Sequence, residues 1–157
     1  MSVPTESVLF TGFPGFIGAR LLPRLAALRP EARLVCLVQP RFMDLARASR
    51  ADLALRHPDL GGRLELLPGD ITEPRLGLSE TAARDVTASL TAAYHLAAVY
   101  DLAVSRDLGM KVNVGGTRHV LAFLAEAPRF ERLHYVSTAY VSGTAKGSSS
   151  KQSVTVK

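Results

Sequence analysis

The chain has 157 residues, of which 47% are hydrophobic and 21% charged, a composition typical of one globular domain and not of a disordered chain. The formal net charge is +5, but three lysines lie in the last fourteen residues, where no acidic residue occurs; subtracting them leaves +2 for residues 1–143, which disfavours a nucleic-acid-binding surface. The single cysteine has no disulfide partner, and the N-terminus lacks a basic leader. The longest apolar segment, 92–104, is too short and polar to cross a bilayer. We therefore expect a cytoplasmic protein without a membrane span.

A glycine-rich turn follows the first predicted strand, residues 8–10, and precedes a predicted helix, residues 19–28. Between a strand and a helix, the spacing Gly-x-x-Gly-x-x-Gly is typical of dinucleotide binding. The first glycine can turn the chain, the second lets the backbone approach a pyrophosphate, and the third lets the helix pack closely on the strand. A glycine-rich turn without a ligand is the alternative. The predicted cofactor-binding residues of this motif are Thr11, Gly12, Phe13, Pro14, Gly15, Phe16, Ile17 and Gly18.

Strands and helices alternate along the rest of the chain. The apolar, β-rich segments predict strands at 33–38, 64–67, 93–98 and 133–137. Helices are predicted at 43–56, 79–90 and 106–127. This alternation predicts an α/β fold, a Rossmann-type doubly wound parallel sheet that stops after about five strands and leaves an edge strand uncovered. We expect one domain over residues 1–143, and a disordered tail over the polar, low-complexity residues 144–157.

The end of the second strand carries the information on cofactor choice. NAD-binding units usually have an aspartate or glutamate there to hold the ribose hydroxyls. This chain has Gln39, Pro40 and Arg41 instead. No carboxylate would repel a 2′-phosphate at this point, and Arg41 can pair with one through charge-assisted hydrogen bonds. The sequence therefore favours NADP over NAD.

Five segments in this order resemble the extended short-chain dehydrogenase/reductase superfamily. They are residues 11–18, Gly69-Asp70-Ile71, 95–98, Asn113-Val114-x-Gly116-Thr117 and 136–143. Within the superfamily, residues 97–102 and 137–141 are most similar to the thioester-reductase and fatty acyl-CoA reductase (male sterility) group. The resemblance covers residues 7–143, which correspond to the N-terminal half of a family domain.

The resemblance implies roles for residues at the strand ends. Asp70 would accept a hydrogen bond from the adenine amino group and Ile71 would pack on the ring, although a plain turn aspartate is the alternative. Ala97, Ala98 and Val99 would leave space for the cofactor after the fourth strand. The group places an arginine nearer the end of the second strand, where this chain has Gln39.

Catalysis in this family uses a serine or threonine hydroxyl, a tyrosine, and a lysine four residues after the tyrosine. Thr138 matches the hydroxyl, and Asn113 would shape its helix and relay protons, with a satisfied buried amide as the alternative. None of the four tyrosines has a lysine four residues later, and the four histidines lack metal-ligand spacing.

The resemblance therefore implies the cofactor-binding part of an NADP-dependent reductase of acyl thioesters or aldehydes, inactive as this isolated chain. A nucleotide-sugar epimerase or dehydratase, and a non-catalytic dinucleotide-binding module, are the alternatives.

Overall fold

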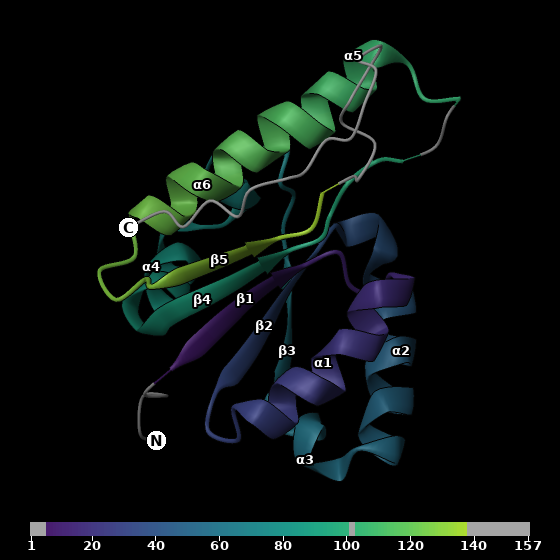
Figure 1. The fold of residues 1–157 in the computed structure, drawn as a ribbon, viewed down its shortest axis with the longest axis vertical. Helices are drawn as coiled ribbons and strands as arrows, with labels where there is room; N and C mark the ends of the chain where they lie inside the picture. The colour runs from purple at the N-terminus through teal and green to yellow at the C-terminus, as the bar shows by residue number, and fades with distance from the viewer. Residues whose placement is uncertain (1–5, 101–102, 138–157) are drawn as a thin grey trace, which may run out of the picture.

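Five parallel strands form one sheet in the order β3-β2-β1-β4-β5 (Figure 1). The computed structural model describes residues 6–100 and 103–137. From β1 the chain moves outward to β2 and β3, then returns past β1 to β4 and β5, so the sheet is doubly wound with its switch point between β1 and β4. This confirms the predicted fold class. The strands are β1 (Ser7–Thr11), β2 (Arg33–Val38), β3 (Leu64–Pro68), β4 (Leu90–His95) and β5 (Arg132–Tyr135).

Helices cover both faces of the sheet (Figure 1). Because side chains alternate along a strand, Val8 and Phe10 of β1 pack with the helices of one face, and Leu9 packs with those of the other. All three side chains are fully buried, as expected for a central parallel strand. The first face carries α1 (Phe16–Leu28), the short η1 (Pro40–Phe42), α2 (Met43–Arg56) and α3 (Pro58–Gly61). The second carries η2 (Pro74–Gly77), α4 (Glu80–Ser89), α5 (Arg106–Gly109), the π-helical η3 (Met110–Gly116) and α6 (Thr117–Ala125).

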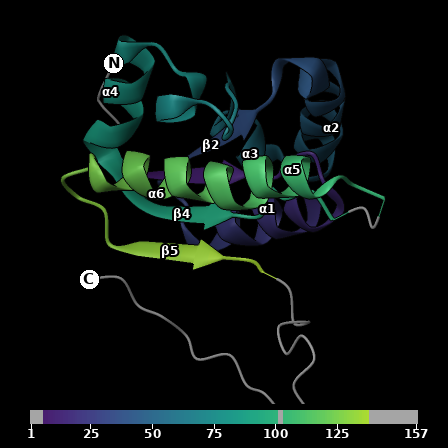
Figure 2. The ribbon, with the colours of Figure 1, turned by 90° about the horizontal axis from the view of Figure 1, so that it is seen from above.

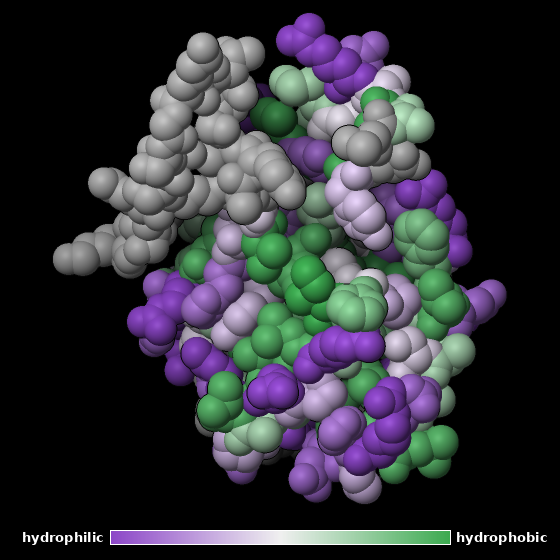
Figure 3. Space-filling view, turned by 45° about the vertical axis from the view of Figure 1, so that its right-hand side comes forward, coloured by the Kyte–Doolittle hydropathy of each residue, from purple (hydrophilic) through white to green (hydrophobic). Residues whose placement is uncertain are grey.

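β5 lies at the outer edge of the sheet (Figure 2). Among the described residues it pairs with β4 alone. Tyr135 and Val136 are 49% and 44% exposed there. One face of the molecule likewise shows apolar side chains gathered near its middle, bordered by hydrophilic ones (Figure 3).

The element boundaries match the predictions for β2 and α2 and differ for β4. The predicted strand at 93–98 is three residues too late, because β4 begins at Leu90 and ends at His95. Beyond His95, the N–H groups of Leu96 and Ala97 both donate to Thr11 Oγ1, at 3.2 and 3.1 Å, which turns the chain away from the sheet. The predicted helix at 106–127 forms as three consecutive segments, α5, η3 and α6.

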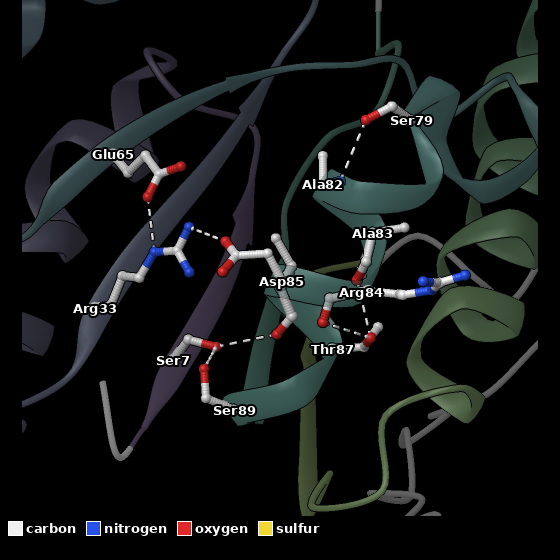
Figure 4. Close-up of polar contacts among 11 residues, drawn as sticks. Ser7, Arg33, Glu65, Ser79, Ala82, Ala83, Arg84, Asp85, Thr87 and Ser89 are labelled. Carbon is white, nitrogen blue, oxygen red and sulfur yellow. Dashed lines mark hydrogen bonds and ion pairs between the residues drawn. The ribbon is translucent and has the colours of Figure 1, made fainter. Parts of the chain in front are cut away.

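Polar contacts link the strands to α4 at the end of the sheet where the strands begin (Figure 4). Arg33 donates from Nε to Glu65 at 2.7 Å and from Nη2 to Asp85 at 2.6 Å, which links β2, β3 and α4. The hydrogen bond to Glu65 raises the pKa of the Arg33 guanidinium. Ser7 donates to the Val86 carbonyl at 3.3 Å and accepts from Ser89 at 3.2 Å. These contacts leave the opposite end of the sheet, where ligands bind in such folds, for the candidate site.

Candidate cofactor site

The glycine-rich turn lies at the switch point of the sheet, between β1 and α1. Gly12 has φ +91°, and a Cβ there would lie 2.9 Å from the backbone nitrogen of Ala97, in the loop after β4. A Cβ at Gly18 would lie 3.1 Å from Cε1 of Phe10 on β1. The structure therefore confirms the predicted turn at Gly12 and the close packing of helix on strand at Gly18.

Gly15 is required by the turn itself. Its N–H donates to the Gly12 carbonyl at 2.9 Å, and a Cβ would lie 2.7 Å from the same oxygen. Gly15 is also exposed and is the N-cap of the thirteen-residue α1, with no side-chain cap among the described residues. The uncapped N–H groups and the helix dipole make this end of α1 suited to an anionic group.

The side chains of the motif point to different places. Thr11 and Phe13 are 1% and 4% exposed, so they hold the turn from inside and present only backbone to a ligand. Phe16 and Ile17 are 73% and 54% exposed at the start of α1. The guanidinium carbon of Arg20 lies 3.6 Å from the centroid of the Phe16 ring, which places a cation beside the turn. Pro14 is half-buried.

Gln39 joins the ends of β2 and β3. Its Nε2 donates to Asp70 Oδ2 at 2.7 Å, and its Oε1 accepts from Arg41 Nε at 3.0 Å. The other Asp70 oxygen accepts the Thr72 N–H at 2.8 Å. Arg41 lies exposed with its guanidinium carbon 4.7 Å from the Phe42 ring centroid. The sequence identified Gln39, Arg41 and Asp70 separately, and the structure brings them together.

Ile71 is 6% exposed and lies against Gly116, the last residue of η3. A Cβ at Gly116 would lie 2.8 Å from Cδ1 of Ile71, so the helix reaches the loop after β3 at this point. The Ile71 side chain therefore belongs to the protein core, on the second face of the sheet.

The side chain of Asn113 forms two hydrogen bonds to the loop after β4. Its Oδ1 accepts the Val99 N–H and its Nδ2 donates to the Val99 carbonyl, both at 2.8 Å. The amide is thus fully satisfied, which explains an asparagine inside a helical stretch. Ala97, Ala98 and Val99 lie in this loop; Ala97 and Ala98 were predicted at the end of the fourth strand, but β4 ends at His95.

His95 connects β1 to α6 through a buried hydrogen-bonded chain. Its Nδ1 lies 2.7 Å from Thr11 Oγ1 and its Nε2 lies 3.0 Å from Thr117 Oγ1. Because Thr11 Oγ1 already accepts two N–H groups, its proton points to Nδ1, and we assign the ring proton to Nε2. Thr117 in turn donates to the Asn113 carbonyl at 2.7 Å. Burial lowers the pKa of His95 to about 4, so the ring is neutral.

Replacement of His95 by glutamine is expected to flatten the pH dependence of stability. Because its pKa falls from an ordinary 6.5 to about 4 on folding, the unfolded chain binds more protons in acid. The contribution of this group is full above the unfolded pKa and is lost as the pH falls toward the folded one, by about 2 kcal/mol between roughly pH 7.5 and pH 5. Urea unfolding at the two pH values measures it. An equal loss of unfolding free energy in the unsubstituted chain and in His95→Gln would contradict the lowered pKa of His95.

Two remaining points concern what lies at the site. Thr138, the predicted catalytic hydroxyl, and the tail at 144–157 lie outside the described residues. Within the described residues no group of three or more histidine, cysteine or acidic side chains could hold a metal ion, and no helix is long and apolar enough to cross a membrane. Cys36 is fully buried in β2, and burial raises the pKa of its thiol, so it takes no part in this site.

The structure connects two further residues to the site, Thr117 and His119. Thr117 occurs in the motif at 113–117 without a predicted role, and it bonds to His95. His119 has no signal in the sequence, because its partner, the Ile71 carbonyl at 3.0 Å, lies 48 residues earlier.

Comparison with known proteins gives consistent matches. The sequence pattern of an NAD(P)-binding family described as "Male sterility protein" matches residues 10–156. The chain is 32% identical to glycine betaine reductase of Emericella nidulans, over 85% of this chain and 11% of that protein. It is 26% identical to fatty acyl-CoA reductase 1 of Arabidopsis thaliana, over 90% of this chain and 33% of that protein.

Among solved structures, the reductase (R) domain of a non-ribosomal peptide synthetase from Mycobacterium tuberculosis matches with a TM-score of 0.74 and 29% identity. That match covers 90% of this chain and 35% of the solved chain. The 157 residues therefore span about a third or less of each of these proteins.

Proposed function

Because this chain belongs to the male sterility family of NAD(P)-binding domains, we propose that it is the NADP(H)-binding part of a reductase. The observation that carries the proposal is the turn at 12–15. Its backbone lies against the loop after β4 and leaves no room for a Cβ at Gly12 or Gly15. The uncapped N-terminus of α1 follows directly, at the switch point of the sheet. This arrangement suits the pyrophosphate of a dinucleotide.

The proposed preference for NADP(H) over NAD(H) rests on the charges at the end of β2. Arg41 is held by Gln39 through Nε, and its remaining guanidinium nitrogens are suited to a 2′-phosphate. Asp70, whose carboxylate accepts a hydrogen bond from Gln39, has a hydrogen bond to each of its two oxygens. The ribose end of the site thus carries a positioned cation.

The substrate class is part of the same proposal. Two of the relatives named above carry the names glycine betaine reductase and fatty acyl-CoA reductase 1. We propose acyl thioesters or aldehydes as substrates of the whole protein, with Thr138 orienting the carbonyl and Asn113 holding the loop on that side. The 29% sequence identity to a reductase domain supports this chemistry. The ADP-L-glycero-D-manno-heptose-6-epimerase of Helicobacter pylori is 22% identical, and that match supports only the shared fold.

The cofactor preference is tested by comparing affinities. The chain is expected to bind NADPH more tightly than NADH, and Arg41→Ala is expected to weaken NADPH binding on the order of tenfold, since a charge-assisted pair is lost. NADH binding should change little. Titration by cofactor fluorescence measures both.

Arg47→Ala is the matched control, because Arg47 is also exposed, near the start of α2, and pairs with Asp44 at 2.8 Å. Tighter binding of NADH than NADPH by the unsubstituted chain would contradict the proposed preference for NADP(H). An equal loss of NADPH affinity in Arg41→Ala and Arg47→Ala would mean that net charge, and not the position of Arg41, causes the effect.

A further inference from the structure

One helical stretch, residues 113–119, reaches both loops that border the proposed site. At its start Asn113 holds Val99, in the loop after β4. At its end His119 Nδ1 lies 3.0 Å from the carbonyl oxygen of Ile71, in the loop after β3. A carbonyl can only accept, so Nδ1 of His119 carries a proton and donates it.

The loop after β3 has a backbone that its sequence alone does not favour. Arg75 (φ 50°, ψ 29°) and Leu76 (φ 62°, ψ 22°) are successive left-handed residues, and neither is glycine. This region is sterically disfavoured for residues with a Cβ, and persists where surrounding contacts determine it.

That same backbone fixes Asp70. The Leu76 carbonyl accepts the Asp70 N–H at 2.8 Å, and the Asp70 carbonyl accepts the Glu73 N–H at 3.1 Å. Leu76 itself is fully buried. The position of the Asp70 carboxylate, and through Gln39 that of Arg41, thus depends on this loop keeping its shape.

Two side-chain contacts from the region of α6 hold the loop. Arg75 pairs with Glu126 at 2.8 Å, but both side chains are more than 40% exposed, and exposed ion pairs stabilise little. The hydrogen bond from His119 is part-buried and lies directly beside the contact of Gly116 with Ile71. It is therefore the stronger of the two tethers.

We propose that His119 is a positioning residue for the adenine half of the dinucleotide site. By donating to the Ile71 carbonyl, it holds the loop that carries Asp70 against α6. The inference rests on the proposed function, because the ends of β2 and β3 are where the adenosine part of a dinucleotide lies in such sheets. The ligand part that His119 affects is thus the adenosine 2′,5′-bisphosphate portion.

The test compares His119→Leu with His119→Asn, using NADPH and 2′,5′-ADP as probes for the 157-residue chain. Asparagine places an N–H donor close to where Nδ1 lies, and leucine has none. His119→Leu is expected to bind both probes about tenfold more weakly, the effect of one lost part-buried hydrogen bond. His119→Asn should stay within about threefold of the unsubstituted chain by the same reasoning. His57→Leu, at an exposed histidine after α2, is the control and should change neither affinity.

Amide hydrogen exchange gives a second readout that needs no ligand. The N–H groups of Asp70 and Glu73 should exchange faster in His119→Leu than in the unsubstituted chain. Their exchange rates should be unchanged in His119→Asn. Unchanged affinities and exchange in His119→Leu would overturn the inference, and so would an equal defect in His119→Asn. Failure of the unsubstituted chain to bind either probe would instead overturn the proposed function, and the exchange comparison would still decide whether His119 holds the loop.

Discussion

Gly15→Val is expected to abolish the binding of NADPH and NADH. A Cβ at this position would lie 2.7 Å from the Gly12 carbonyl oxygen, so the turn has to open. The two methyl groups would then occupy the N-terminus of α1, where the pyrophosphate is proposed to bind. Fluorescence titration with each cofactor measures the loss.

Gly62→Val is the matched control, since a Cβ at Gly62 meets no atom within 4 Å. It should bind as the unsubstituted chain does. Circular dichroism separates loss of binding from loss of fold. An affinity of Gly15→Val that stays close to that of Gly62→Val would mean that the cofactor does not approach this turn.

The 157 residues alone are expected to show no oxidation of NADPH with acyl-CoA or aldehyde substrates. No tyrosine of the chain is followed by a lysine four residues later, so the proton donor used by this family is missing. Loss of a positioned acid costs on the order of a hundredfold to ten-thousandfold in rate, and the lack of substrate positioning adds to it. Loss of NADPH absorbance follows the reaction.

A longer protein in which a segment with the Tyr-x-x-x-Lys pair follows these residues should regain turnover. In that protein Thr138→Ala should lower the rate, since the hydroxyl that orients the carbonyl is lost. Measurable turnover by residues 1–157 would instead mean that another group of this chain delivers the proton.

The parts of the fold that depend on local sequence could be predicted. The strand at 33–38 is apolar and β-rich throughout, and the structure has β2 at the same residues. The glycine spacing likewise predicted the turn at Gly12 and the close packing at Gly18. Both features have a signal in the local sequence, although the space at Gly12 is limited by Ala97, in the distant loop after β4.

Features that depend on distant partners could not be predicted. Just beyond β4, the N–H groups of Leu96 and Ala97 donate to the hydroxyl of Thr11, about 85 residues earlier, a contact that no local pattern indicates. The π-helical geometry of η3, where Asn113 bonds to Val99 and Gly116 lies against Ile71, was not predicted. The left-handed backbone of Arg75 and Leu76 has no signal in the sequence, because neither residue is a glycine.

The proposed cofactor site is tested most directly by an isothermal titration of the 157-residue chain with NADPH. We expect saturable binding of one cofactor per chain, with 2′,5′-ADP as a competitor and with weaker binding of NADH. A chain that unfolds cooperatively on heating but shows no saturable binding of NADPH or NADH would contradict the proposed site.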